Sequence, residues 1–244
     1  RELNNISQTE QGVATNGRHN NLYWQEETYL TYNRTLKGLH RVNAMLGMSW
    51  QAYASRYNYS EAQSFESDLF EDLNMGTGKN PRPPGSNYDE WKMNSYFLRL
   101  AYTYNDRYSA TFTARSDGSS KFGKNNKYAF FPSAGLAWIV SEESWLKGNP
   151  WLSNLKLHTS YGLTGNSEIA TYRSLARVGS GTVLLDGKRA GAAYISSLAN
   201  PDLKWEKTAQ FDVGFDLGLF NNAVNLDFSY YYKHTTDLLL DTPI

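Results

Sequence analysis

The chain has 244 residues, with 24 Lys and Arg, 24 Asp and Glu, and no Cys. The zero net charge argues against a nucleic-acid-binding protein, whose phosphate contacts need an excess of basic residues. Without Cys, the chain has no disulfide, no thiolate zinc site and no cysteine nucleophile. No run approaches the ~18 consecutive apolar residues of a transmembrane helix, but a transmembrane β-barrel stays compatible because its strands are apolar on one face only.

Alternating apolar and polar residues predict eight β-strands and no long helix. In one of them, for example, Phe211 and Val213 alternate with Asp212 and Gly214. In chain order the predicted strands are residues 22–35, 39–54, 94–105, 108–115, 129–140, 155–163, 211–219 and 224–232. Soluble strands usually have ~5–6 residues, whereas tilted membrane strands need ~9–11. These longer segments favour an all-β fold, namely a segment of an antiparallel transmembrane β-barrel.

The connections between these strands alternate in length. Short ones lie near residues 36–38, 105–107 and 220–222, one of medium length is 141–154, and the long ones are 55–93, 116–128 and 164–204. Outer-membrane barrels have short periplasmic turns and long extracellular loops, so we expect the long connections outside the cell. Trp and Tyr gather near the strand ends, as in interfacial girdles, although both residue types also favour strands in general.

Few groups in the sequence suggest catalysis or metal binding. Glu142 and Glu143 are adjacent, so on a strand they would point to opposite faces and could not act as an acid–base pair. Asp212, Asp216 and Asp227 lie on the polar faces of neighbouring strands, where they suit a glycosidase carboxylate pair or the lining of a wet lumen. The four His residues form no close i, i+4 pair for zinc. We therefore predict no catalytic residue, no metal and no cofactor.

The long connection 55–93 carries aromatic side chains that could stack on a sugar or a peptide. The predicted substrate-binding residues are Tyr57, Tyr59, Tyr88 and Trp91. The same rings could instead pack against one another. Aromatic content alone suits a glycan and a peptide equally, so the substrate class stays open.

Three stretches resemble those of the SusC/RagA-type TonB-dependent outer-membrane transporters. Residues 105–146, NDRYSATFTARSDGSSKFGKNNKYAFFPSAGLAWIVSEESWL, are similar to the family's D-R-Y turn, its R-x-D-G-S-S-x-F-G strand end, its F-P-S-x-x-x-x-W returning strand and its S-E-E turn. Residues 152–166 and 200–240 resemble its S-Y-G-x-T-G-N and N-x-x-L-K-W-E-x-T stretches. The residues that carry these motifs are Asp117, Gly118, Ser119, Ser120, Phe122, Gly123, Phe131, Pro132, Ser133, Trp138, Tyr161, Gly162, Gly165, Asn166, Trp205 and Glu206.

The resemblance implies part of a large plugged barrel in outer-membrane lipid that imports oligosaccharides or peptides. It also implies two partners, a SusD-like surface lipoprotein and the TonB complex. On this basis we expect residues 1–244 to be a partial barrel domain, without the signal peptide, the N-terminal plug and the terminal strands. The expected location is the cell outer membrane, crossed many times. Ser133, Gly135 and Ala137 are expected to face inward, where small residues leave room for a plug.

Two other functions account for parts of the pattern. A soluble β-sandwich that binds carbohydrate, such as an adhesin or an accessory module, explains the alternation and the aromatic residues. It does not explain the long strands or the rhythm of the connections. A hydrolase on a β scaffold rests only on the three aspartates. The place of the apolar faces distinguishes the two folds, because a sandwich packs them together and a barrel exposes them to lipid.

Overall fold

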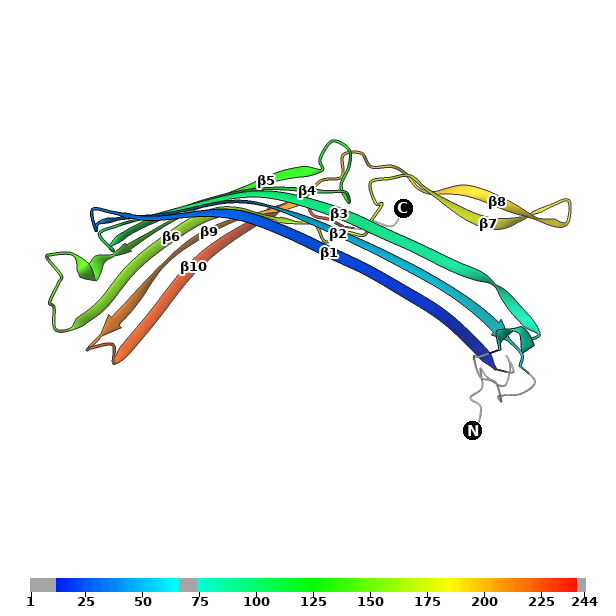
Figure 1. Ribbon diagram of the computed structural model, residues 1–244, viewed down its shortest axis with the longest axis horizontal. Helices are drawn as coiled ribbons and strands as arrows, with labels where there is room; N and C mark the ends of the chain where they lie inside the picture. Colours follow the sequence, from blue (N-terminus) through cyan, green and yellow to red (C-terminus); the bar gives the residue numbers. More distant parts are fainter. Residues whose placement is uncertain (1–11, 66–73, 241–244) are drawn as a thin grey trace. The chain divides into compact units, whose positions relative to one another are not determined.

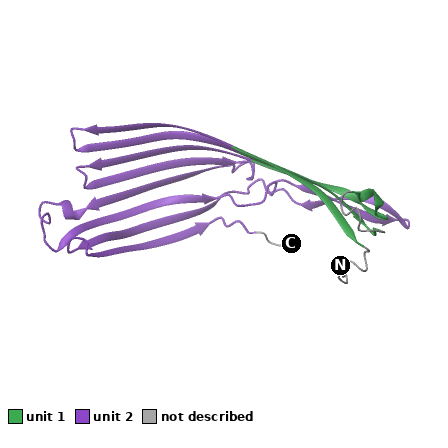
Figure 2. Ribbon diagram, turned by 60° about the horizontal axis from the view of Figure 1, so that its bottom comes forward, with its two compact units in different colours: residues 1–24, 52–91 green, residues 25–51, 92–244 purple. Residues whose placement is uncertain are grey.

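The computed structural model describes residues 12–65 and 74–240, which fall into two compact units (Figure 2). Unit 1 contains the described residues of 1–24 and 52–91, and unit 2 contains those of 25–51 and 92–244. The first three strands contribute to both units. Unit 2 holds all the other strands.

Eight strands form one sheet in the order β1-β2-β3-β4-β5-β6-β9-β10 (Figure 1). Their bounds are β1 Val13–Leu36, β2 His40–Gln63, β3 Asn80–Tyr104, β4 Tyr108–Ser119, β5 Tyr128–Ile139, β6 Leu152–Asn166, β9 Glu206–Leu219 and β10 Val224–Thr236. From β3 to β10, each neighbouring pair is antiparallel. The other two strands, β7 (Arg177–Leu185) and β8 (Lys188–Ser197), form a separate two-stranded sheet. The all-β antiparallel prediction is therefore confirmed.

The eight predicted strands all exist, but three predicted loops were too long. The connection expected at 55–93 is mostly strand, because β2 continues to Gln63 and β3 begins at Asn80. β4 extends to Ser119, into the connection expected at 116–128. The connection expected at 164–204 contains the β7–β8 hairpin. The four aromatic residues assigned to the first of these loops therefore lie on strands.

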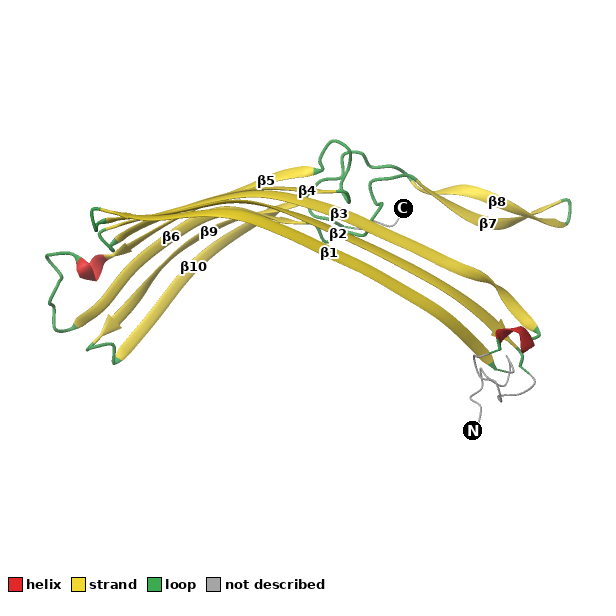
Figure 3. Cartoon of the chain, viewed as in Figure 1, coloured by secondary structure: helices red, strands yellow, loops and turns green. Residues whose placement is uncertain are grey.

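The described residues contain only two short helical segments, both of the 3-10 type (Figure 3). They are η2 (Met75–Thr77) in unit 1 and η3 (Val140–Glu142) between β5 and β6. Neither these nor any other described stretch forms a helix that is long and apolar enough to cross a bilayer.

The sheet of unit 2 has one apolar and one polar face, and the strand register keeps each face consistent from strand to strand. Phe112 pairs with Leu100 on one side and Ala134 on the other, which continues the apolar face. Their neighbours Thr113 and Ser133 pair on the polar face. A shift of one residue in any strand would exchange its two faces, so the pattern fixes the register.

The apolar face is open. Its side chains include Leu136, Phe228 and Tyr230, which are 61%, 52% and 56% exposed. Among the described residues, only six apolar side chains are buried: Ala62, Phe122, Ala129, Phe131, Val140 and Trp205. A sandwich would bury the apolar faces of its sheets against each other, so the described residues do not form one.

The short connections of unit 2 lie together at one end of its sheet (Figure 1). The turn between β3 and β4 has Asn105 and Asp106 at φ 50° and 53°, a pair of positive angles that suits a tight hairpin. The same end carries the 3-10 segment η3. At the other end lie the β4–β5 loop and the segment that leads into β9. The predicted alternation of connections is thus present within unit 2.

Candidate functional site

Four buried aromatic and small side chains form a cluster at the long-connection end of unit 2. We call it the Trp205 cluster; its members are Phe122, Ala129, Phe131 and Trp205. The Trp205 ring centroid lies 4.7 Å from that of Phe122 and 5.6 Å from that of Phe131. Trp205 Nε1 also donates a hydrogen bond to the carbonyl of Lys127 (3.0 Å). Three motif residues far apart in the sequence therefore meet in one packed unit.

The cluster joins two connections. The β4–β5 loop lies against the segment 200–205, where Gly123 N donates to Leu203 O (2.9 Å). Asn126 Nδ2 donates to the carbonyl of Asp202 (3.1 Å), and Asn125 Nδ2 donates to its carboxylate (3.1 Å). Backbone and side-chain hydrogen bonds thus hold the β4–β5 loop against the segment 200–205.

The D-G-S-S motif shapes the end of β4. Asp117 is buried, and both of its carboxylate oxygens accept from Arg115 Nε (2.7 and 2.8 Å). Ser120 exchanges two hydrogen bonds with the backbone of Lys92, each of 2.9 Å, and Ser119 is 3% exposed. A Cβ on Gly118 would lie 2.7 Å from the Asn94 amide oxygen. These residues hold β4 to β3 where the pairing ends.

The remaining motif residues fall into three groups. Gly165 lies under the Phe131 ring, and Asn166 donates to Glu206 (3.2 Å), so both support the Trp205 cluster. Gly162 lies against Ser133 on the polar face, where a Cβ would come within 2.7 Å of the serine Cβ. The others lie away from the cluster: Pro132 and Tyr161 on the apolar face, and Trp138 at the short-connection end.

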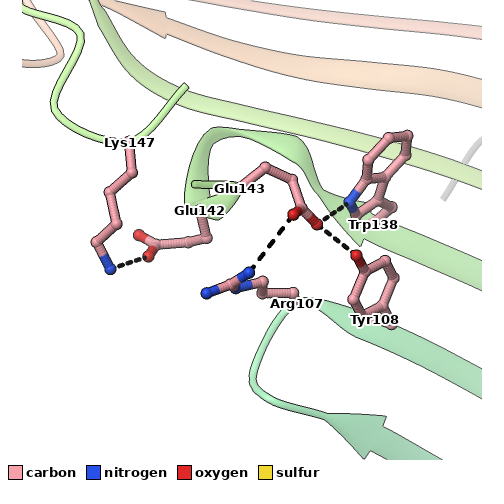
Figure 4. Close-up of polar contacts among 6 residues, drawn as sticks. All are labelled: Arg107, Tyr108, Trp138, Glu142, Glu143 and Lys147. Atoms are coloured by element: carbon pink, nitrogen blue, oxygen red, sulfur yellow. Dashed lines mark hydrogen bonds and ion pairs between the residues drawn. The ribbon is translucent and has the colours of Figure 1, made fainter. Parts of the chain in front are cut away.

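At that opposite end, Glu143 links three elements, as Figure 4 shows. Its carboxylate accepts hydrogen bonds from the Tyr108 hydroxyl and from Trp138 Nε1 (3.0 Å), and it pairs with Arg107 (3.4 Å). The hydrogen bonds from Tyr108 and Trp138, then the Arg107 charge, hold the pKa of Glu143 below its usual value. Only the D-R-Y and S-E-E letters of the motif could have indicated this carboxylate in advance.

We expect this end of the sheet to weaken in acid because of Glu143. Its lowered pKa means that its contribution to stability is complete above the unfolded-state pKa and is lost as pH falls through the folded-state pKa. The unfolding temperature of the Glu143→Gln variant in detergent should therefore fall less between pH 7 and pH 3 than that of the unchanged protein. Glu142→Gln is the control, because the Glu142–Lys147 pair is exposed. If the unfolding temperatures of the unchanged protein and of Glu143→Gln fell equally between pH 7 and pH 3, this role of Glu143 would be contradicted.

Unit 1 carries the aromatic residues predicted to bind substrate, and each of them contacts another ring or a guanidinium. Tyr57 stacks on Tyr59, with ring centroids 5.5 Å apart. Trp91 lies 6.0 Å from Tyr53 and 6.3 Å from Tyr23, two rings that the sequence analysis did not select. Tyr88 lies under the Arg56 guanidinium (5.5 Å). Of the four predicted residues, Tyr57 and Tyr59 therefore stack on each other.

The polar face of unit 2 contains a hollow of about 880 Å³ that is lined by residues of seven adjacent strands, from β1 to β9. Small and hydroxyl side chains form its floor: Thr111, Thr113, Ser133, Gly135, Ser160 and Gly162. Arg99 and Arg115 line it from β3 and β4, and Asp212 lines it from β9. Of the residues expected to face inward, Ser133 and Gly135 line this hollow.

The other two aspartates of the sequence analysis lie on the same face and do not form a catalytic pair. Asp216 binds Lys156 (3.0 Å), and Asp227 is its cross-strand partner on β10. Asp212 instead accepts from Gln210 (2.8 and 3.0 Å) and from Ser160 (3.3 Å). Within residues 12–65 and 74–240, no group of three or more His, Asp or Glu could hold a metal ion. These carboxylates are parts of polar networks along the sheet.

Comparison with known proteins identifies the family. A sequence profile of the family described as "TonB dependent receptor-like, beta-barrel" matches residues 2–244. TonB-dependent receptor P3 of Formosa agariphila is 38% identical over 233 residues, which cover 96% of this chain and 23% of the receptor. TonB-dependent receptor SusC of Bacteroides thetaiotaomicron is 39% identical over 152 residues, which cover 59% of this chain and 15% of SusC.

Comparison with solved structures supports the same family. The structure of the RagAB peptide transporter matches with a TM-score of 0.86 at 30% identity, over 94% of this chain and 25% of the matched chain. The RagAB peptide importer in its closed-closed state matches with a TM-score of 0.85 at 32% identity and the same coverage. The chain thus spans about a quarter or less of the length of the proteins it matches, and these relatives are receptors and transporters rather than enzymes. It belongs to the TonB-dependent receptor β-barrel family, in which it is similar to SusC and RagA.

Proposed function

We propose that this chain is part of an importer that carries oligosaccharides or peptides across the outer membrane, with energy supplied through the TonB complex. The observation that carries the proposal is the two-faced sheet of unit 2, with exposed Leu136 and Phe228 on one face and Arg99 and Asp212 on the other. In a transmembrane barrel, the apolar face contacts lipid and the polar face lines the lumen. Residues 1–244 would then be a partial barrel domain.

The proposed orientation places the Trp205 cluster outside the cell and the Glu143 network at the periplasmic side. Long connections face outward in barrels of this type, and short turns face the periplasm. Trp138 and Tyr108, whose rings stack at 6.2 Å beside Glu143, suit the inner aromatic girdle. The stacked Tyr57 and Tyr59, with Tyr88 and Trp91, all in unit 1, would offer substrate contacts.

A surface lipoprotein of the SusD type is the proposed partner. The support is the similarity to SusC and to the RagAB transporter. Affinity-tagged protein extracted from the outer membrane in mild detergent is expected to retain such a lipoprotein. The TonB complex would act through parts of the protein beyond this barrel segment.

Deleting the gene tests the import function directly. Cells would receive either a pepsin digest of casein or a mixed glucan hydrolysate, and depletion of each pool would be followed by mass spectrometry. We expect the deletion to abolish most uptake of one pool, and a protonophore to do the same in unmodified cells, because TonB-driven transport needs the proton gradient. A strain complemented with the intact gene is the control. Equal depletion of both pools with and without the gene would reject an importer of either class.

A further inference from the structure

We propose that a second hollow, on the apolar face of unit 2, binds one zwitterionic phospholipid of the periplasmic leaflet. An acyl chain would fill the hollow, and the headgroup would lie at the short-connection end of the sheet. This inference rests on the membrane placement proposed above and adds a specific lipid site on the outside of the barrel. It follows from the lining of the hollow, from its direction and from the charges beside its mouth.

The apolar-face hollow has a volume of about 890 Å³ and is lined by residues of six adjacent strands, from β3 to β10. It exists because Ala110 and Thr159 are short where their neighbours on this face are long. Two rows of cross-strand partners cross the hollow, Tyr102–Ala110–Leu136–Thr159–Val213 and Tyr108–Trp138–Leu157–Phe215–Phe228.

The polar atoms of these apolar-face side chains are already hydrogen-bonded within the protein. Thr159 Oγ1 donates to the Asp212 carbonyl (2.8 Å), and the Tyr102 hydroxyl bonds His40 Nδ1 (2.7 Å). The Tyr108 hydroxyl and Trp138 Nε1 both donate to Glu143 (Figure 4). The two rows therefore offer a ligand mainly hydrocarbon and ring surface, which suits an acyl chain and disfavours a ligand with many polar groups.

The hollow begins at the short-connection end and runs away from it. Tyr102 lies close to the end of β3 and Tyr108 begins β4, whereas Val213 lies well inside β9, which ends at Leu219. Six strands at the usual spacing cover ~24 Å, and a strand tilt of ~35–45° converts this to ~14–17 Å along the membrane normal. Half of the ~30 Å hydrocarbon core is ~15 Å, so the hollow matches the depth of one leaflet.

The short connections beside the mouth of the hollow carry only paired charges. The pairs are Asp106 with Arg41, Arg107 with Glu143 (3.4 Å) and Lys147 with Glu142 (3.0 Å). The connection between β9 and β10 has no charged residue. An anionic headgroup would need a cation without a partner, whereas a zwitterionic one can set its phosphate against Arg41 and its ammonium against Asp106. The charges thus favour a headgroup such as phosphoethanolamine.

The test uses the complete outer-membrane protein in detergent micelles. Phosphatidylethanolamine and phosphatidylglycerol with identical acyl chains are added in equal amounts, and native mass spectrometry counts the lipids that stay bound. We expect one phosphatidylethanolamine per protein to be retained, about tenfold more tightly than phosphatidylglycerol, as one additional charge-assisted hydrogen bond provides. Equal retention of the two lipids by the unchanged protein would contradict the zwitterionic site.

Two variants change the hollow itself. Ala110→Phe should fill it and lower retention by about tenfold, because the acyl chain loses buried methylene contacts. Leu136 is 61% exposed, so Leu136→Ala should fold normally and lower retention by about threefold. The controls are Val224→Phe and Leu226→Ala on the apolar face of β10, which do not line the hollow. Both should leave retention within about twofold.

A third variant tests the position of the headgroup. Asp106→Asn leaves Arg41 without its ion-pair partner, so the preference should shift toward phosphatidylglycerol by about tenfold. Glu61→Gln is the control, because it frees Arg82 in unit 1, away from these connections. An unchanged preference in Asp106→Asn would mean that the headgroup does not lie at this end.

Three results would overturn the site. Equal retention by Ala110→Phe, Leu136→Ala and their controls would place the lipid elsewhere. A second copy of the chain, or another protein, whose binding excludes the lipid would mean that the hollow is a protein interface. Lipid binding without selectivity, together with normal uptake that depends on the gene, would reject the site and leave the importer standing. Selective lipid binding with unchanged uptake in the deletion strain would do the reverse.

Discussion

The Trp205→Ala variant is expected to lose about 3–5 kcal/mol of free energy of unfolding, as large-to-small substitutions at packed aromatic sites do. Trp205 is 4% exposed, and its ring contacts those of Phe122 and Phe131. Removing it leaves a cavity and also leaves the Lys127 carbonyl without its donor. Urea unfolding of the complete protein in detergent, followed by tryptophan-independent circular dichroism, measures the loss.

Two further variants separate packing from the hydrogen bond and from a general effect of losing a tryptophan. Trp205→Phe keeps a ring but loses the Nε1 donor, so it should cost less than the alanine variant, about 1–3 kcal/mol. Trp151 is 66% exposed, and Trp151→Ala should change stability by about 0.5 kcal/mol or less. If Trp205→Ala and Trp151→Ala were equally stable, the cluster would not hold the two connections together.

The protease sensitivity of the two connections gives a second measurement of the effect of Trp205→Ala. In the intact cluster, the β4–β5 loop and the segment 200–205 hold each other through Gly123, Asn125 and Asn126. Local opening increases when buried contacts are few, so Trp205→Ala should make both segments more sensitive to protease on intact cells. Cleavage at 200–205 alone would mean that the β4–β5 loop is stable without its partner.

Alternation was enough to predict the strands of unit 2, because each strand there has one apolar and one polar face. The alternation of apolar and polar residues alone predicted a strand at 211–219, and the structure has β9 at Glu206–Leu219. Pairing then follows from short turns between neighbours in sequence. The β6–β9 pair is different, since β7 and β8 intervene in the chain. The sequence pattern contained no signal for that insertion, because small and exposed residues dominate both strands.

The prediction of a long loop at 55–93 was wrong for a physical reason. The stretch N-P-R-P-P-G, from Asn80 to Gly85, reads as a chain breaker because proline cannot donate to a strand ladder. The β3–β4 register ends where Met93 pairs with Ser119. Residues of β3 before that point pair with β2 only, so one edge of the strand needs no donors. Edge positions tolerate proline, and the strand continues through the motif.

The site was only partly predictable for a different reason. The family motifs indicated Phe122, Phe131 and Trp205 as structural residues, but periodicity does not bring together loops that are about eighty residues apart in the chain. That Arg99 and Asp212 line the same hollow could likewise not be predicted, since only the strand order brings β3 and β9 into one sheet. Tertiary contacts of this kind are what a single sequence conveys least.

Gly123→Ala tests whether the junction of the two connections depends on backbone contact. A Cβ on Gly123 would overlap the Pro201 carbonyl and lie 3.0 Å from Leu203 N, and both obstacles are backbone atoms that cannot rotate away. The connections must therefore separate or shift, and the expected loss is about 1–3 kcal/mol, as for overpacked sites. Urea unfolding in detergent measures it under the conditions used for Trp205→Ala.

The matched control is Gly191→Ala on β8, where an added Cβ meets nothing within 4 Å. That change should be neutral or stabilising by up to about 1 kcal/mol, since alanine restricts the unfolded chain. Because both variants add the same methyl group, only the difference in surroundings can separate them. Equal stability of the two would mean that the segment 200–205 moves aside without cost, and then the Trp205 ring alone, rather than the backbone junction, would hold the β4–β5 loop.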